Sequence, residues 1–308
     1  MKLLVVVDNH EWAMTKRAAA VLACMPGVEA TTVPASEMKD KTPEEMRKYD
    51  LLWCTGHASF VKEPPGIPWV WTISCEGARL EPLLDKVPAW GWSASAILTQ
   101  TFKSRLQVGQ RTRGALPLLL VPHGVDTDRY SPHKVKPPTR LVGMAANVVD
   151  GEKAVHKGLP FAEGGCAAAK MDFALASCFP EDKRLTLKQM PDWYRTLWAY
   201  CQPSISEGGS NTLMEAMATG VPCLLCRNVG YHGEVCRDAR EYPDGEVLFV
   251  ERSVTSIKDT LIALKRDGDL YRRLRRNSRD FVKRHSWEDA ATRLYDLFRY
   301  LTVKDPTQ

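Results

Sequence analysis

Short apolar runs alternate with segments of helical pattern along the first part of the chain. KLLVVV fits a buried strand, and TKRAAAVLACM after it has helical character. Further apolar runs follow as ATTV, DLLWC, PWVWTI and ALPLLLVP, and the intervening EPLLDKV and SAILTQTFKSRL are predicted to be helical. Strands that alternate with helices predict a parallel sheet with helices on both faces.

The pattern breaks at HGVDTDRYSPHKVKPPTR, where Pro132, Pro137 and Pro138 indicate a linker. A second alternating series follows in RLVGMAAN, MDFALASCF, WAYCQPS, VPCLLC and EVLFV, and the tail from Val254 to about Leu301 is predicted to be helical. We therefore expect an α/β protein of two Rossmann-like, doubly wound domains that face a cleft. The expected divisions are residues 1–135, residues 136–285 and a C-terminal helix, 286–308, that packs back on the first domain.

The stretch SEGGSNTLMEAMATG, which runs from Ser206 to Gly220, has the pattern of a ligand-binding loop and helix. Gly208 and Gly209 would let the backbone approach a ligand closely. A helix is predicted to begin at Asn211, and the free N–H groups of its first turn suit a phosphate. Open α/β sheets bind ligands at the carboxyl ends of their strands, and this loop follows a predicted strand.

Two carboxylates flank this anion-binding pattern in an E-x7-E spacing, Glu207 and Glu215. Placed to either side of a phosphate, they would accept hydrogen bonds from hydroxyl groups. Simpler interpretations remain open: Thr212 and Glu215 fit a capping box, and Glu207 could be an ordinary loop carboxylate.

VPHGVDTDRYSP, the segment MPDWYRTLWAYCQPSISEGGSNTLMEAMATGVPCLL, DGEVLFV and the final charged helix together resemble the GT-B glycosyltransferases of the retaining family 4 type. The resemblance covers most of residues 121–298. It implies that Glu207 binds the hydroxyl groups of the donor sugar and that Glu215 binds the ribose. Lys157, in HKGL, resembles the lysine that neutralises the donor diphosphate. The sugar and diphosphate would be held by Gly208, Gly209, Ser210, Asn211 and Thr212.

Family members usually pair that lysine with an arginine after the first strand of the second domain. Here Asn147 stands near that place, and Arg140 is a candidate substitute. The resemblance implies a metal-independent enzyme with no cofactor, since the nucleotide-sugar is a co-substrate. Asp126-Thr127-Asp128 fits a D-x-D metal motif but belongs to the linker signature.

The first domain would bind the acceptor, and here the chain departs from the family's motifs. DNHEWAMTKR replaces a Gly-Gly loop, and WTISCEG replaces a stretch that often carries a histidine. We place His57 at the catalytic centre and Asn9, His10, Trp12 and Glu76 on the acceptor side. A lone histidine is more often structural. Of the six tryptophans before residue 93, we expect most to lie in the core and one or two to form a platform for a flat acceptor ring.

Composition and charge limit the cellular environments and the binding partners that we expect for this protein. The chain has 308 residues, 44% of them apolar, and a formal net charge of +5. No apolar run is long enough to span a bilayer, and the start of the chain does not have the pattern of a signal peptide. Nine scattered cysteines favour a reduced, cytoplasmic protein, with Cys223 and Cys226 as buried thiols rather than zinc ligands.

Two basic stretches could contact an anionic partner, although a solvated face explains either. They comprise Lys103, Arg105, Arg111 and Arg113, and Arg272, Arg273, Arg275, Arg276 and Arg279.

We expect a retaining transferase that moves a hexose from a nucleotide-sugar, with UDP-glucose favoured, to an acceptor hydroxyl group. Some small relatives of this layout in bacteriophages glycosylate hydroxymethylated DNA bases, so such a base in the host cytoplasm is the leading acceptor. A carbohydrate or lipid-linked acceptor remains open. So do two other classes: a nucleotide-sugar isomerase or epimerase, and a non-catalytic relative that binds nucleotide or nucleic acid.

Overall fold

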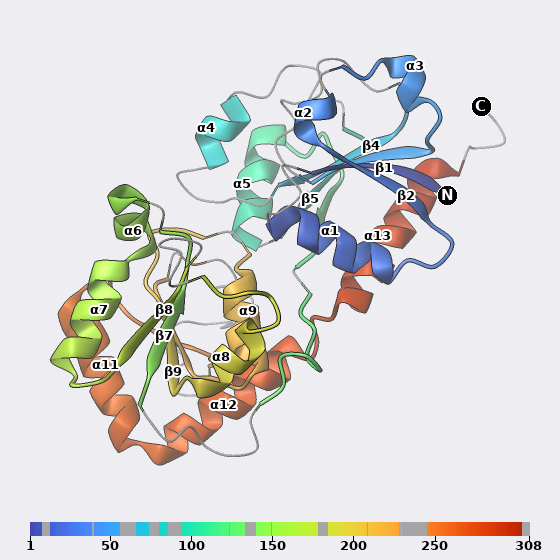
Figure 1. Ribbon diagram of the computed structural model, residues 1–308. Coiled ribbons are helices and arrows are strands. Elements are labelled where there is room, and N and C mark those ends of the chain that lie inside the picture. The colour runs from blue at the N-terminus through green and yellow to red at the C-terminus, as the bar shows by residue number, and fades with distance from the viewer. Residues whose placement is uncertain are drawn as a thin grey trace. The chain divides into compact units, whose positions relative to one another are not determined.

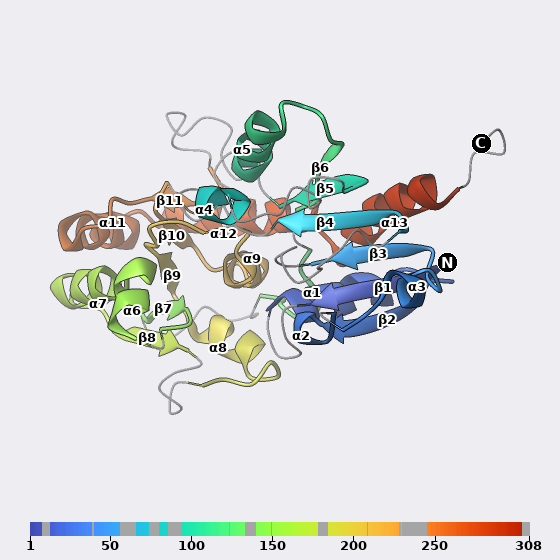
Figure 2. The same ribbon diagram turned by 90° about the horizontal axis from the view of Figure 1, so that it is seen from above.

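The computed structural model folds into two α/β units, shown in Figures 1 and 2. It describes residues 1–7, 13–38, 40–55, 66–73, 80–85, 94–100, 102–122, 124–132, 140–148, 150–177, 184–207, 209–227, 229 and 245–303. The first unit comprises residues 1–123 and 287–308, and the second comprises residues 124–286. Within the described ranges, no helix is long and apolar enough to cross a membrane.

The first unit is built on a six-stranded parallel sheet of order β2-β1-β3-β4-β5-β6. The strands are β1 (Lys2–Val7), β2 (Glu29–Pro34), β3 (Leu51–Cys54), β4 (Trp69–Ile73), β5 (Ala96–Thr99) and β6 (Leu118–Leu120). The helices are α1 (Ala13–Ala23), α2 (Ala35–Met38), α3 (Pro43–Met46), α4 (Leu80–Asp85), α5 (Phe102–Thr112) and α13 (Trp287–Thr302).

Helices cover both faces of this sheet, which explains why its strands other than the edge strand β2 are almost continuously apolar. Leu4 and Val6 of β1 pack in one core with residues of α2, α3, α4 and α5. Leu3, Val5 and Val7 point the other way and pack in a second core with α1 and α13. The alternation along one strand therefore supplies both cores, as the pleat of a strand requires.

Three of the six tryptophans before residue 93 lie among the described residues, and all three are in these cores. Trp69 and Trp71 share the first core, as the WVWT alternation predicts, and Trp53 lies in the second. None of the three exceeds 3% exposure. Trp53 donates its Nε1–H to Thr72 Oγ1 at 2.8 Å, and its ring lies 5.7 Å from that of Phe298 on α13. These three side chains are therefore core residues rather than an acceptor platform.

One segment of the first unit differs from the prediction. SAILTQTFKSRL was expected to be helical throughout, but Ala96–Thr99 forms β5 and the helix α5 begins at Phe102. The strand is fully buried between β4 and β6, and it pairs with both. Sheet pairing and burial outweigh the helix propensity of the Ala-Leu run at this place.

The second unit has a five-stranded parallel sheet of order β11-β10-β9-β7-β8. The strands are β7 (Val142–Ala145), β8 (Phe173–Ala176), β9 (Ala199–Gln202), β10 (Cys223–Leu225) and β11 (Leu248–Phe249). The helices are α6 (Gly151–Lys157), α7 (Leu159–Ala168), α8 (Met190–Thr196), α9 (Asn211–Ala218), α11 (Val254–Arg266) and α12 (Gly268–Val282). Figure 1 shows α7 and α11 on one side of the sheet and α8 and α9 on the other.

The division between the units lies earlier than the predicted 135/136 position. Val125 and Tyr130 are buried in the core of the second unit, so the segment that follows residue 123 belongs to it. The backbone N–H of Val125 also donates to the carbonyl of His285 at 3.0 Å, which joins the two ends of this unit. The proline-containing stretch begins only after Ser131, inside the second unit.

Candidate donor site in the second unit

The strand order of the second unit reverses between β7 and β9. The chain passes from β7 to β8 on one side and returns to β9 on the other. Doubly wound sheets bind ligands at the carboxyl ends of the strands on either side of such a reversal. Asn147 follows β7 and is exposed, and Glu207 follows β9, so two predicted site residues lie at this position.

Glu207 and Lys157 form an ion pair there. Lys157 Nζ lies 2.5 Å from Glu207 Oε1, and their side chains are only 21% and 16% exposed. Ser204, which is fully buried, donates to the same Oε1 at 2.9 Å and also lies 3.3 Å from the Lys157 carbonyl. Partial burial strengthens such charge-assisted contacts, so this corner of the sheet fixes one carboxylate beside one ammonium group.

The turn between α6 and α7 places Lys157. Gly158 ends α6 with φ of 80°, a left-handed conformation that suits glycine. A Cβ atom on Gly158 would lie 2.2 Å from the carbonyl oxygen of Pro203, so only glycine allows the turn to approach the loop that carries Glu207. The backbone N–H of Ile205 donates to the His156 carbonyl at 2.9 Å across the same contact.

Arg252, which follows β11, joins the same two segments. Its Nε–H donates to the Pro203 carbonyl at 3.0 Å, and its Nη2 donates to the Val155 carbonyl at 2.5 Å. Its guanidinium group lies 4.8 Å from the centre of the Phe161 ring. Arg252 thus stabilises the relative position of Lys157 and Glu207 from outside the pair.

The N-terminus of α9 lies next in the chain. Ser210 is its N-cap, and its hydroxyl accepts from the Leu213 N–H at 3.3 Å. The N–H groups of Asn211 and Thr212 belong to the first turn, where a helix offers them no acceptor. Asn211 Oδ1 is buried without a hydrogen-bond partner. Backbone donors at the positive end of a helix suit an anion such as a diphosphate.

Two further contacts hold this first turn in place. Gln202, at the end of β9, exchanges hydrogen bonds with the Ser210 hydroxyl at 3.1 Å. The Tyr200 hydroxyl donates to Thr212 Oγ1 at 2.9 Å. The helix N-terminus is therefore fixed to β9, the strand that precedes the loop with Glu207.

Glu215 lies one turn further along α9, and its carboxylate contacts tyrosines. The Tyr194 hydroxyl donates to Glu215 Oε2 at 3.0 Å, and the Tyr130 hydroxyl lies near this carboxylate. Burial, followed by the nearby Glu215 charge, raises the pKa of both tyrosines, so both remain protonated donors at neutral pH. The capping-box interpretation of Thr212 and Glu215 is wrong, because Ser210 caps the helix and Glu215 lies beyond its N3 position.

The structure thus brings the donor-side predictions into one region of the second unit. They are Lys157, Glu207, Gly209, Ser210, Asn211, Thr212, Glu215 and Asn147. Gly208, His57, Asn9, His10, Trp12 and Glu76 lie outside the described residues.

Arg140 does not fit the role of a diphosphate-binding arginine. It precedes β7 and therefore lies at the amino end of the strand, whereas Glu207 follows the carboxyl end of the parallel strand β9. The sequence prediction also missed Ser204, Arg252, Tyr194 and Tyr130. Tyr130 does stand inside the linker signature VDTDRYSP, which is the one signal that could have identified it.

The described cysteines do not form a metal site. Cys223 and Cys226 are buried free thiols, and burial raises the pKa of both, that of Cys226 to about 11. No group of metal-binding side chains occurs among the residues that the structure describes. Asp126 acts as a turn residue, because its Oδ1 accepts from the N–H groups of Asp128 and Arg129 at 3.2 and 2.9 Å.

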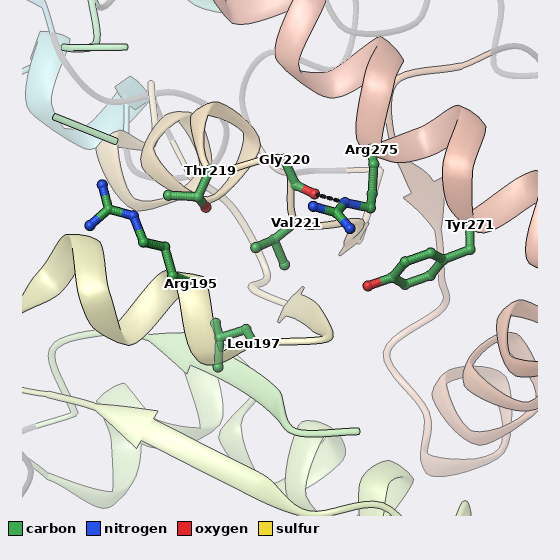
Figure 3. A pocket seen from close by; sticks show the side chains of 7 residues that line it. All are labelled: Arg195, Leu197, Thr219, Gly220, Val221, Tyr271 and Arg275. Carbon is green, nitrogen blue, oxygen red and sulfur yellow. Dashed lines mark hydrogen bonds between the residues drawn. The ribbon is translucent and has the colours of Figure 1, made fainter. Parts of the chain in front are cut away.

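A small pocket lies at the other end of α9, as Figure 3 shows. Its free volume is about 10 Å³, far too small for a nucleotide. Arg275 donates its Nε–H to the Gly220 carbonyl at 3.0 Å there, and Arg195 approaches from α8 on the other side. The pocket is thus part of the packing of the α9 C-terminus and separate from the Glu207 site.

Comparison with known proteins agrees with this geometry. Residues 183–281 match the family model "Glycosyl transferases group 1", a region that includes Glu207 and all of α9. A search of curated proteins found no match.

Similar solved structures show the fold over nearly the whole chain. HepE of Anabaena, in complex with UDP and glucose, has a TM-score of 0.78 at 11% identity, over 98% of this chain and all of that one. Sucrose-phosphate synthase from Thermosynechococcus elongatus has a TM-score of 0.70 at 12% identity, over 98% and 99%. The N-terminal domain of Candida albicans trehalose-6-phosphate phosphatase has a TM-score of 0.67 at 10% identity, over 98% and 97%.

Two Rossmann-like units of this kind define the GT-B architecture, and this chain has that fold. The group 1 domain and the fold together support a GT-B glycosyltransferase.

Proposed function

We propose that the protein is a retaining, metal-independent glycosyltransferase that moves a hexose from a nucleotide-sugar, UDP-glucose in the first instance, to an acceptor hydroxyl group. The observation that carries the proposal is the pairing of Lys157 with Glu207 beside the N-terminus of α9, at the strand reversal of the second unit. The binding of UDP and glucose by HepE, a protein of the same fold, supports the choice of donor.

Each described group has a task in this proposal. Glu207 accepts hydrogen bonds from hydroxyl groups of the sugar, and the Lys157 ammonium group turns to the diphosphate when the donor enters. The first N–H groups of α9 bind a phosphate, and Glu215 accepts from the ribose. The pair in the free protein keeps each charge compensated until the donor offers each a new partner, which limits the desolvation cost of the empty site.

In the transfer step the bond from the anomeric carbon to the diphosphate oxygen breaks, and a bond from the acceptor oxygen to that carbon forms on the same face. The acceptor proton passes to the departing diphosphate oxygen, so the step needs no protein base. Negative charge grows on the leaving group as the bond breaks. Lys157 and the α9 dipole then bind the transition state more strongly than the donor.

We place the acceptor on the first unit and propose a hydroxymethylated base in DNA. The exposed side chains of Arg105 and Arg113, on α5 and just after it, support this choice because they suit phosphates. Arg111 contributes less than the sequence suggested, since it forms an ion pair with Asp85.

Glu207→Ala provides the test of the donor site. The protein is mixed with UDP-glucose and DNA that contains hydroxymethylcytosine, with unmodified DNA as a control, and the digested nucleosides are weighed by mass spectrometry. We expect a hexose mass gain on the modified base, its loss in Glu207→Ala, and its retention in Glu163→Ala, which removes an exposed carboxylate on α7.

The outcomes separate donor and acceptor. Hydrolysis of UDP-glucose without a mass gain on DNA would shift the acceptor to a carbohydrate or lipid-linked hydroxyl group. Isomerisation of the donor in the absence of any acceptor would indicate an isomerase or epimerase in place of a glycosyltransferase. Unchanged turnover in Glu207→Ala would refute the donor site itself.

A further inference from the structure

Three tyrosine side chains, Tyr130, Tyr194 and Tyr200, form a row of neighbouring rings next to α9. The rings of Tyr130 and Tyr194 are 6.0 Å apart at 68°, and those of Tyr194 and Tyr200 are 6.0 Å apart at 60°. All three are buried, with exposures of 5%, 0% and 0%. They come from the segment after residue 123, from α8 and from β9, so tertiary packing alone brings them together.

The hydroxyl groups of this row meet the polar side chains of α9. Tyr200 donates to Thr212 Oγ1 at 2.9 Å, and Tyr194 donates to Glu215 Oε2 at 3.0 Å. The hydroxyl of Tyr130 lies near the same carboxylate. A glutamate has three rotatable side-chain bonds, and holding its carboxylate against two fixed tyrosine side chains, one of them by the Tyr194 hydrogen bond, removes most of that freedom in advance.

Arginines fix the position of Tyr130 relative to α9. Arg195 on α8 donates to the carbonyls of Ser131 and Arg129 at 2.9 and 2.7 Å. Arg279 on α12 donates to the carbonyls of Tyr130 and Thr127, both at 3.2 Å, and also to the carbonyl of Ala218, the last residue of α9.

Arg279 contacts both the segment that contains Tyr130 and the C-terminal end of α9, the helix with Glu215. It therefore fixes the position of that segment relative to α9. Its charge also lies at the C-terminus of α9, where a cation is favourable.

We propose that Tyr194 and Tyr130 are positioning residues that hold the Glu215 carboxylate in the orientation in which it accepts the ribose hydroxyl groups of the donor nucleotide. This inference rests on the proposed function and extends it to residues that do not themselves contact the donor. A carboxylate offers about four acceptor positions, so it can accept from tyrosine hydroxyl groups and from a ribose at the same time. Donors that orient the carboxylate beforehand reduce the entropy that binding must remove.

The alternative is that the tyrosines only stabilise the packing of α8 and α9. A packing role would affect every ligand of the second unit alike. A positioning role acts through Glu215 and therefore depends on the ribose hydroxyl groups.

The test measures the affinity of the full chain for UDP and for 2′,3′-dideoxy-UDP by calorimetry. We expect Tyr194→Phe and Tyr130→Phe each to weaken UDP binding about 5- to 20-fold, which is less than the roughly 10- to 150-fold of a full hydrogen bond to a charged group, because each tyrosine contacts Glu215 in the free protein as well as in the complex. Neither should change the affinity for the dideoxy nucleotide by more than about 2-fold. In a Glu215→Ala background the tyrosine changes should have no further effect on UDP, as a double-mutant cycle requires for coupled residues.

Tyr271→Phe is the matched control. Tyr271 is also buried in the second unit, at 6% exposure, but its hydroxyl donates to the Trp198 carbonyl at 3.1 Å. We expect this variant to bind UDP as the wild type does. Unfolding midpoints of all variants show whether each has kept its fold.

Four results would overturn the proposal. Equal weakening of both nucleotides, or a tyrosine effect that persists in Glu215→Ala, would show a packing role. Unchanged UDP affinity in both tyrosine variants would show no role at all. A wild-type protein that binds none of UDP, GDP or ADP at millimolar concentration would refute the donor site and with it this inference, a result distinct from the other three.

Discussion

Gly158→Ala tests whether the close approach of the α6–α7 turn to Pro203 builds the donor site. Two costs add at this position. Gly158 has φ of 80°, where an alanine costs about 1–2 kcal/mol. The new Cβ would also lie 2.2 Å from the Pro203 carbonyl oxygen and 2.8 Å from its carbon, so the backbone must move. Overpacking of this kind costs about 1–3 kcal/mol. We therefore expect a loss of about 2–5 kcal/mol in the free energy of unfolding.

Two other glycines of the second unit separate these costs. Gly220 has φ of 68°, but its nearest neighbour, Pro132 Cγ, lies at an ordinary 3.4 Å, so Gly220→Ala should lose only about 1–2 kcal/mol. Gly151, at the start of α6, has no atom within 4 Å of a new Cβ, and its φ is not left-handed. Gly151→Ala should therefore gain about 0.5–1 kcal/mol. Urea denaturation of the three variants measures the series.

The same substitution should also weaken donor binding. Movement of the turn displaces Lys157, the residue before Gly158, from Glu207, whereas Gly220→Ala acts at the far end of α9. We expect UDP affinity to fall about 10-fold or more in Gly158→Ala and to stay within about 2-fold in Gly220→Ala, because misplacement of a site residue by about 1 Å is costly. Equal stability of Gly158→Ala and Gly220→Ala would refute the close-contact argument, and unchanged UDP affinity would refute its link to the site.

Two further predictions concern buried side chains. Ser204→Ala removes a buried donor to Glu207, so we expect a loss of about 1–2 kcal/mol in stability and a several-fold higher KM for the nucleotide-sugar; Ser278→Ala, which removes a buried hydroxyl that donates to the Glu246 carbonyl, should destabilise the fold without raising KM. Cys226 has a pKa of about 11 in the fold against 9.0 for an ordinary thiol, because of burial. The unfolded chain therefore releases this proton first, and above pH 9 this thiol should lower the free energy of unfolding by about 1.4 kcal/mol per pH unit until about pH 11. Urea midpoints at pH 8 and pH 10 in reducing buffer should show a smaller fall in Cys226→Ala, and identical falls would contradict the buried-thiol assignment.

The sequence by itself determined the elements that local pattern encodes. Apolar runs such as KLLVVV are continuous because helices cover both faces of a parallel sheet, so they mark the strands wherever they lie. The helix after Glu207 and its stop at Gly220 also follow from local signals, since a cap and a left-handed glycine act within one turn. The residue types of the donor side could be predicted for the same reason.

Only the tertiary structure decided which of these residues meet. Lys157 and Glu207 stand 50 positions apart, and they pair because β7 and β9 are neighbours and the Gly158 turn touches Pro203. The two tyrosines near the Glu215 carboxylate, Tyr194 and Tyr130, come from α8 and from the segment after residue 123, so no spacing in the sequence indicates them.

Ala96–Thr99 shows the same limit for the fold. Its composition favours a helix, and its place between β4 and β6 makes it a strand. The physical reason is common to all three cases: local propensities amount to fractions of a kcal/mol per residue, and burial and pairing with distant segments outweigh them.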